Sequence, residues 1–230
     1  SLAVGLAAYP IPSGTVLYVS PNGDNANSGT LAAPKRTLGS AISSAPSGAA
    51  VVLREGEYHE QVTVPSTKTL TIQAYPNEAV WLDGSQQVSS WSGTGPWTAP
   101  YGVSWSPIPS SNYPQAGDGR AHFPEQVWIN DVAQTQLADG AIPGPGQFSV
   151  NRTTDVVSLG TAPSGKNVRV ARLNYAIVAA GRIYLNGIGV RRYSPLEIEG
   201  ISALMYFGGV SQGSIIENCV FQDSGMGGIA

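Results

Sequence analysis

Short apolar runs recur along the first third of the chain, and residues that favour turns separate them. Residues 15–20 alternate like a half-buried strand, and strand-forming side chains cluster again at 51–53, 70–72 and 80–82. A Pro-Asn or an Asp-Gly pair follows each of the last two runs. The runs from residue 51 onward are this short and have no helices between them, which excludes a doubly wound α/β topology. The pattern leaves a β-sandwich or a β-solenoid.

One segment of this region has helical periodicity instead. Between Thr37 and Ala45, apolar residues recur at i, i+3, i+4 and i+7, beginning at Leu38. Thr37 is a suitable N-cap residue, and Pro46 with Gly48 ends the pattern. We therefore expect one short helix near the N-terminus.

Two segments near the other end of the chain share a pattern. Leu185-Asn-Gly-Ile-Gly-Val190 and Ile216-Glu-Asn-Cys-Val-Phe221 both read apolar, polar, Gly or Asn, apolar or small, any, apolar. Their offset of 216 − 185 = 31 residues lies within the range of solenoid repeats. Gly187 and Asn218 hold the same position, and both residue types tolerate left-handed backbone, so we expect a bend there between consecutive strands. The repeat favours a solenoid over a sandwich.

The middle of the chain is typical of antiparallel structure. Asn130-Asp131 lies between two short strand-like segments, 127–129 and 132–133, as in a tight hairpin. Residues 147–150 and 156–159 predict a second hairpin. Residues 168–171 then lead back to the solenoid pattern. We expect an inserted antiparallel β module over residues 85–172.

Domain organisation follows from these patterns. The predicted fold class is all-β: a right-handed parallel β-helix with an N-terminal capping helix and a small inserted antiparallel β module. Residues 1–84 form the cap and first coils, and residues 173–230 form further coils. Ala230 follows a strand pattern directly, so we expect a C-terminal remainder or a second chain to stack on an open end of the helix.

Composition narrows the possible functions. Hydrophobic residues make up 42% of the 230 residues and charged residues 12%, with a net charge of −3, which disfavours nucleic-acid binding. No apolar run reaches the roughly 20 residues of a membrane span. Cys219 is the single cysteine, so there is no internal disulfide and no thiol cluster for a metal. Residues 1–8 are similar to the end of a signal peptide, and an ordinary ordered N-terminal segment is the alternative. On the first interpretation we expect a secreted, extracellular protein.

Three motifs resemble a known family. Tyr18-Val-Ser-Pro-Asn-Gly-Asp-Asn-Ala-Asn-Ser-Gly-Thr30, Pro34-Lys-Arg-Thr-Leu38 and Val51-Val-Leu-Arg-Glu-Gly-Glu-Tyr58 are similar to the opening of pectate-lyase-like right-handed parallel β-helix proteins. Residues 85–124, which are rich in Ser, Gly and Pro and contain three tryptophans, resemble the side module of β-helix glycoside hydrolases, such as those acting on xylo-oligosaccharides. So does Val127-Trp-Ile-Asn-Asp131. The resemblance implies the fold strongly and the reaction weakly, because lyases, hydrolases, epimerases and non-enzymatic proteins share it. It also implies that the catalytic carboxylates come from coils beyond this chain.

Candidate catalytic residues are carboxylates on one face of a strand. Glu197 and Glu199 would lie about 6.6 Å apart on an extended segment, a spacing that suits a pair of hydrolase carboxyl groups or a shared cation. A solvated loop between coils explains the same residues. Asp223 flanks a strand of the repeat, as a turn residue or as a catalytic one.

Three tryptophans of the insertion, Trp91, Trp97 and Trp105, are the candidate substrate-binding residues. Indole faces stack on sugar rings, although the same three side chains could form a small core that attaches the module. Asp24, Asn25 and Asn27 slightly resemble a calcium loop but lack its terminal acidic residue, so we interpret them as a turn.

These observations leave three functions open. The first is a secreted glycoside hydrolase acting on a polysaccharide or oligosaccharide, with no cofactor. The second is a non-catalytic carbohydrate-binding or structural β-helix protein. The third is a polysaccharide lyase, which would require Ca²⁺ held by carboxylates and a basic residue to take the proton.

Overall fold

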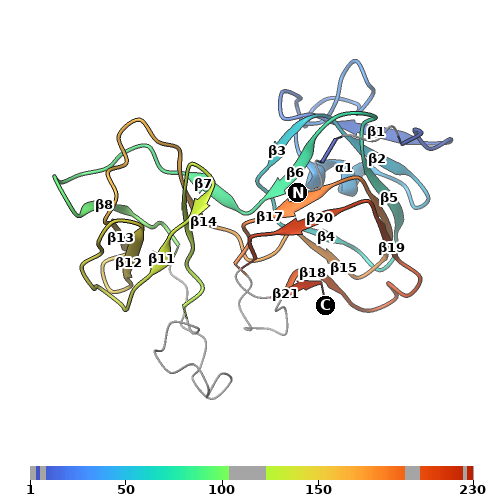
Figure 1. Ribbon diagram of the computed structural model, residues 1–230. Coiled ribbons are helices and arrows are strands. Elements are labelled where there is room, and N and C mark those ends of the chain that lie inside the picture. The colour runs from blue at the N-terminus through green and yellow to red at the C-terminus, as the bar shows by residue number, and fades with distance from the viewer. Residues whose placement is uncertain (1–3, 6–8, 104–122, 195–202, 225–226, 230) are drawn as a thin grey trace.

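The fold consists almost entirely of β-strands. The computed structural model describes residues 4–5, 9–103, 123–194, 203–224 and 227–229. Figure 1 shows two lobes, one built of parallel sheets and the other of mostly antiparallel strands, with β7 and β14 on the side of the second lobe that faces the first. No helix in these ranges is long and apolar enough to cross a membrane. The all-β prediction is confirmed.

Three parallel sheets form the larger lobe. Sheet A holds β1 (Val16–Val19), β2 (Ala50–Leu53), β5 (Thr69–Ala74), β16 (Arg182–Asn186) and β19 (Ile215–Glu217), in that order. Sheet B holds β3 (Gly56–Tyr58), β6 (Val80–Asp83), β17 (Gly189–Arg191) and β20 (Val220–Gln222). Sheet C holds β4 (Val62–Val64), β15 (Ile177–Ala179), β18 (Ala203–Phe207) and β21 (Gly227–Ile229). From β2 onward the chain visits sheets A, B and C in turn, and we call each such passage a coil.

Side chains of equivalent strand positions stack inside the lobe. Leu17, Val51, Ile72, Leu185 and Ile216 are successive partners across sheet A. The first four are buried and Ile216 packs against the same core. Full burial of one such side chain is worth about 1.5–3 kcal/mol, so each coil is stabilised chiefly by the coils beside it.

The predicted helix is present as α1 (Leu38–Ser44). The Thr37 side chain accepts a hydrogen bond from the Ser40 N–H, as an N-cap residue does. Glu60 accepts two more, from the N–H groups of Leu38 and Gly39 at 2.7 and 2.9 Å. Burial raises the pKa of Glu60, against the opposing effect of these two hydrogen bonds. The helix packs against β1, β2 and β4 and adds its apolar face to the core.

The predicted repeat is also present. Leu185 pairs with Ile216 in parallel register, so the 31-residue offset is one step from coil to coil. At the next bend, Gly187 has φ of 73° and Asn218 has φ of 56°. Both residues adopt the left-handed backbone that their types tolerate, which explains why the two segments look alike.

Two four-stranded sheets form the smaller lobe. Sheet D holds β10 (Val132–Ala133), β9 (Val127–Ile129), β14 (Val168–Ala171) and β7 (Ser85–Gln87), all antiparallel. Sheet E holds β11 (Thr135–Gln136), β12 (Gln147–Asn151), β13 (Val156–Leu159) and β8 (Trp97–Pro100), with only β11 and β12 parallel. We call these two sheets the side module.

Both predicted hairpins occur in the side module. Asn130 and Asp131 have φ of 50° and 64°, the two positive values that a tight two-residue hairpin turn requires. Strands β12 and β13 form the second hairpin. The side module has its own core, in which Trp128 and Phe148 are almost fully buried.

Candidate functional site

Trp91 and Trp97 line a pocket of about 510 Å³ in the side module. The other lining side chains are mainly polar, among them Gln87, Ser89, Ser164 and Lys166. Both indoles are half-buried and pack against the core of the side module on part of their surface. Both indoles thus contribute to a small core, and both also form a wall of the pocket; sugar binding by them stays a prediction. We call this the aromatic pocket.

Local backbone structure holds the two indoles in place. Ser92 and Thr98 exchange backbone hydrogen bonds of 2.9 Å, which closes a short loop between the tryptophans. The Trp91 indole N–H donates to the Val88 carbonyl at 2.9 Å. Trp97 begins β8 and pairs with Leu159 of β13. The pocket is thus built on sheet strands and a hydrogen-bonded loop, which fixes its walls before any ligand arrives.

Lys166 supplies the positive charge of the aromatic pocket. Its Nζ atom donates to the Ala162 carbonyl at 2.6 Å, and an ammonium group has three donors. Among the described residues, no ion pair involves Lys166. The pocket therefore offers indole surface, neutral hydrogen-bonding groups and spare N–H donors, which together suit a polyhydroxylated ring.

Several predicted site residues cannot be placed. Trp105, Glu197 and Glu199 lie outside the described residues. Asp223 is described: it follows β20 in left-handed backbone, with φ of 53°. Its Oδ2 atom lies 3.8 Å from Nε of Arg192.

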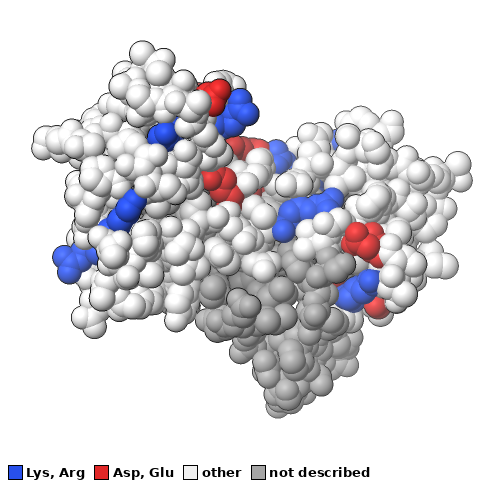
Figure 2. All heavy atoms as spheres, turned by 180° about the vertical axis from the view of Figure 1, so that it is seen from behind, with Lys and Arg blue, Asp and Glu red and all other residues white. Residues whose placement is uncertain are grey.

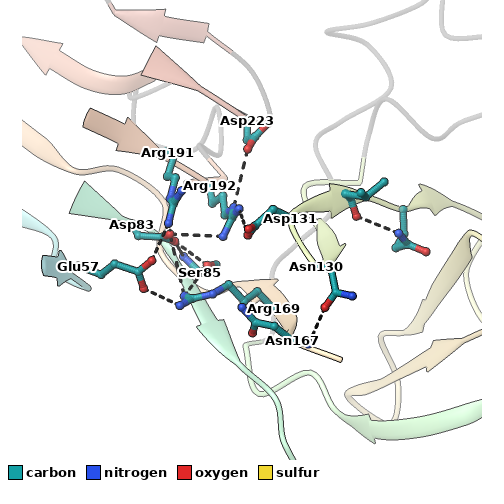
Figure 3. A network of polar contacts seen from close by, with 12 residues as sticks. Glu57, Asp83, Ser85, Asn130, Asp131, Asn167, Arg169, Arg191, Arg192 and Asp223 are labelled. Carbon is teal, nitrogen blue, oxygen red and sulfur yellow. Dashed lines mark hydrogen bonds and ion pairs between the residues drawn. The ribbon is translucent and has the colours of Figure 1, made fainter. Parts of the chain in front are cut away.

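Asp223 belongs to a charged network between sheet B and the side module, shown in Figure 3. Asp83 is at its centre and has no exposed surface. Its Oδ1 atom accepts hydrogen bonds from the Ser85 N–H and hydroxyl, at 2.8 and 2.5 Å. Its Oδ2 atom accepts from Nε of Arg191 at 2.7 Å and lies 3.6 Å from Nη1 of Arg192.

Glu57 and Asp131 complete the network from opposite sides. Glu57 accepts hydrogen bonds from Arg169 of the side module at 2.5 Å and from Arg191 at 2.6 Å. Asp131, in the turn of the first hairpin, accepts from Arg192 at 2.6 Å. That hydrogen bond and the neighbouring guanidinium groups lower the pKa of Asp131.

The geometry of this network is that of a bridge between the two lobes. Arg191 and Arg192 extend from sheet B, whereas Arg169 lies in sheet D and Asp131 in the turn that joins two of its strands. A substrate cannot reach Asp83, because its side chain is fully buried. Two of the arginines also stack on tryptophans: the guanidinium carbon of Arg191 lies 4.5 Å from the Trp81 ring centroid, and that of Arg192 lies 5.3 Å from the Trp128 ring centroid. The network thus fixes how the side module sits on the parallel sheets.

The segment that resembles a calcium loop is held by a lysine. The ammonium group of Lys35, a residue only 7% exposed, donates to the carbonyls of Asn25 and Asn27 at 3.2 and 2.9 Å. The Asn25 side chain accepts hydrogen bonds from the N–H groups of Arg36 and Thr37. The carbonyls that a cation would need are therefore occupied, in agreement with the interpretation as a turn. Within the described ranges, no group of three or more His, Cys, Asp or Glu residues could hold a metal.

Comparisons with known proteins give partial sequence matches. No family model matches the chain. Over 76 residues, which are 31% of this chain and 16% of the relative, the sequence is 45% identical to uncharacterized protein YwoF of Bacillus subtilis. Over 92 residues, 37% of this chain and 22% of the relative, it is 32% identical to pectate lyase PEL9 of Emericella nidulans.

Two solved structures cover more of the chain. "The complex structure of XylC with xylose" matches with a TM-score of 0.68 and 14% identity, over 91% of this chain and 40% of that one. A structure titled "Glycoside hydrolase" matches with a TM-score of 0.56 and 14% identity, over 79% of this chain and 51% of that one. At this identity the likeness shows a common fold. The chain spans less than two thirds of each of these four proteins.

Proposed function

We propose that this chain is the N-terminal part of a secreted glycoside hydrolase with a right-handed parallel β-helix, in which the aromatic pocket binds a sugar ring of a polysaccharide or oligosaccharide. The shared fold supports this proposal, since the matching structures are titled as a complex of XylC with xylose and as a glycoside hydrolase. The partial match to a pectate lyase also points to carbohydrate chemistry.

The observation that carries the proposal is the aromatic pocket itself. Two tryptophans chosen from the sequence as sugar contacts, Trp91 and Trp97, line one pocket together. On the face of the molecule shown in Figure 2, Lys and Arg side chains are few and scattered, several of them beside Asp or Glu, and most of the surface is neutral. Such a surface suits an uncharged or weakly charged polymer better than a polyphosphate.

The catalytic carboxyl groups are proposed to come from further coils, since the chain spans only 40% and 51% of the two solved chains. The strand order is compatible with further coils. Strands β19, β20 and β21 are each the last strand of their sheet, so one side of each has no paired strand among the described residues. Further coils or a second chain stacking there would cover Ile215 and Ile229, which are 48% and 49% exposed.

Sugar binding by the aromatic pocket is tested by titrating the chain with xylohexaose and following tryptophan fluorescence and heat. In the Trp91→Ala/Trp97→Ala variant we expect the affinity of this pocket to fall by more than tenfold, because both stacking surfaces are lost. The Lys166→Met variant keeps the length of the side chain but loses its donors, and we expect about a tenfold loss.

A matched control is Ile142→Ala, since Ile142 lies on the side module but is 82% exposed and outside the pocket. It should bind like the parent chain. Equal affinity of the tryptophan variant and the parent, with far-UV circular dichroism unchanged, would contradict the assignment of the pocket.

A second candidate is a non-catalytic carbohydrate-binding or structural β-helix protein. It is favoured by two of the described carboxylates, Asp83 and Glu125, which are buried and paired with arginines and so are not accessible to a substrate. A Ca²⁺-dependent lyase is the third candidate, supported by the match to pectate lyase PEL9. Release of reducing ends from xylan indicates a hydrolase, whereas absorbance of unsaturated products from pectin that disappears with a chelator indicates a lyase. Retention on polysaccharide gels without any product indicates a binding protein.

A further inference from the structure

A second groove lies on the outer face of sheet A, on the lobe that does not contain the aromatic pocket. It has a volume of about 490 Å³, and its residues come from β5, β16 and the end of β19. The N-terminal segment Tyr9–Pro12 forms the opposite wall. We call this the sheet A groove. Nothing in the proposed function uses it.

Polar side chains in register form the floor of the sheet A groove. Gln73, Asn186 and Glu217 are successive partners on β5, β16 and β19. The two amides are 2% and 7% exposed, which is unusual for the outer face of a sheet. The wall segment accounts for part of this burial, because the Gln73 amide donates to the Pro10 carbonyl at 3.2 Å.

Each buried amide keeps one hydrogen-bonding atom for a ligand. Oδ1 of Asn186 accepts from Asn218 at 3.0 Å, and the Gln73 amide nitrogen is used by Pro10. Neither Oε1 of Gln73 nor Nδ2 of Asn186 has a hydrogen-bond partner within the described residues. Neither atom is among the buried polar atoms that lack a partner, so both reach the solvent in the groove and present an acceptor and a donor to whatever enters it.

Two aromatic rings border the same space. The Tyr184 hydroxyl donates to a carboxylate oxygen of Glu217, which fixes the phenol ring over the groove, and this hydrogen bond raises the pKa of Tyr184. On the other wall, Tyr9 packs where Gly187 has no side chain: a Cβ atom there would lie 2.5 Å from the Tyr9 ring. Aromatic rings beside amide and carboxylate groups are the means by which proteins hold sugars, by stacking and by hydrogen bonds to hydroxyl groups.

Charge and strand pairing select among ligands. No Lys or Arg is among the described lining residues, and Glu217 is acidic and exposed. An anionic polymer would be repelled. A peptide would bind best by adding a strand to a free sheet edge, but β5 and β16, which form most of the floor, are each paired on both sides. The outer edge of β19 is the place proposed above for further coils. A neutral sugar needs neither a cation nor a free edge.

We propose that the sheet A groove is a second carbohydrate-binding site, which takes neutral sugar units and excludes uronic acids. It shares only its class of ligand with the proposed function, because its residues and its lobe are different. A protein with both sites would hold a long polysaccharide at two points, which increases overall affinity through effective concentration.

The test separates the two sites. In a chain carrying Trp91→Ala and Trp97→Ala, we expect residual binding of xylohexaose in calorimetry and much weaker binding of hexagalacturonate. Adding Tyr184→Ala should weaken xylohexaose binding at least tenfold. Tyr184→Phe, which keeps the ring, should retain most of the affinity and guards against a failure to fold. Thr63→Ala, at an exposed position on sheet C, is the control and should change nothing.

Glu217→Gln gives an independent readout. It keeps a hydrogen-bond acceptor for Tyr184 but removes the charge, so we expect hexagalacturonate to bind more tightly at low ionic strength. Two results would overturn the proposal, both measured in the chain that lacks the two tryptophans. One is that adding Tyr184→Ala leaves xylohexaose binding unchanged, and the other is that hexagalacturonate binds as tightly as xylohexaose. Loss of all binding on removing the two tryptophans would end this proposal and leave the proposed function standing. Absence of sugar binding in the unaltered chain would end both.

Discussion

Replacing Asp83 with alanine tests how far the stability of this protein depends on the charged network between its lobes. The Asp83 side chain is fully buried, and it accepts a hydrogen bond from Arg191 at 2.7 Å. The guanidinium of Arg192, only 1% exposed, lies 3.6 Å from the same oxygen. Asp83→Ala removes the carboxylate that both cations share, while Arg191 keeps Glu57 and Arg192 keeps Asp131. Breaking a buried pair costs about 3–5 kcal/mol when the remaining charge is left unpaired. Because each arginine keeps one partner, we expect the free energy of unfolding to fall by about the lower end of that range.

Urea denaturation, followed by far-UV circular dichroism and by tryptophan fluorescence, measures this change. Urea is preferable to guanidinium chloride because added ions screen the charges under test. Coincident transitions by the two probes are required, since a chain with two lobes need not unfold in one step. The matched control is Glu78→Ala, which breaks a pair with Arg54 whose side chain is 36% exposed. Such a pair contributes about 1 kcal/mol or less.

A double variant separates an unpaired charge from lost packing. Asp83→Leu combined with Arg192→Leu removes one charge of each sign, so we expect it to be more stable than Asp83→Ala alone. If Asp83→Ala instead unfolds within about 1 kcal/mol of the parent, like the surface control, the network contributes little to stability and the reasoning is refuted.

Three further changes have predictable results. Asp131→Asn should make the free energy of unfolding depend less on pH in acid. The hydrogen bond from Arg192 lowers the pKa of Asp131, so the ionised carboxylate stabilises the folded state above the ordinary pKa of 3.8. This stabilisation is lost as the pH falls through the lowered pKa. Gly187→Ala should cost roughly 1–2 kcal/mol for its φ of 73°, and more because its Cβ atom meets Tyr9. Thr37→Ala should cost about 1 kcal/mol, since it removes the helix cap.

Each of these has a matched measurement. The free energies of unfolding of Asp131→Asn and of the parent are compared by urea denaturation at a series of acidic pH values. An identical pH dependence would show that Asp131 does not contribute to the loss of stability in acid. For Gly187→Ala the control is Gly146→Ala, where φ is 77° but no atom lies within 4 Å of an added Cβ, so only the backbone cost remains. Equal losses at the two glycines would show that the Tyr9 contact is unimportant. Thr37→Ser, which keeps the hydroxyl, should behave like the parent in thermal unfolding.

Local patterns allowed much of the fold to be predicted. The helix and its cap at Thr37, the hairpin at Asn130-Asp131 and the 31-residue step between Leu185 and Ile216 are all present. Each depends on interactions within a few residues or on a repeat that is visible in the chain itself. The parallel stacking of the coils then follows from burying the same apolar positions in every coil.

The candidate site was only partly predictable, because its residues are distant in sequence. Trp91 and Trp97 were found by residue type, but the contribution of Lys166 depends on β7 and β14 lying side by side. The charged network was missed for the same reason, since Arg169 and Glu57 meet only when the side module docks. One signal was available: a step of 31 residues from Arg192 leads to Asp223, and the two side chains are indeed neighbours.

The side module also has a consequence for the order in which the chain folds. Ile177 pairs with Val62 in sheet C although 177 − 62 = 115 positions separate them, whereas Val51 and Ile72 in sheet A are 72 − 51 = 21 positions apart. Closing the longer loop from a disordered chain costs about 1.5 kcal/mol more. That difference largely disappears if the side module forms first, because pairing Ser85 with Ala171 brings the two ends of the insertion together. The kinetically favoured route therefore completes the side module early, and the coil it interrupts then closes as if it contained only a short turn.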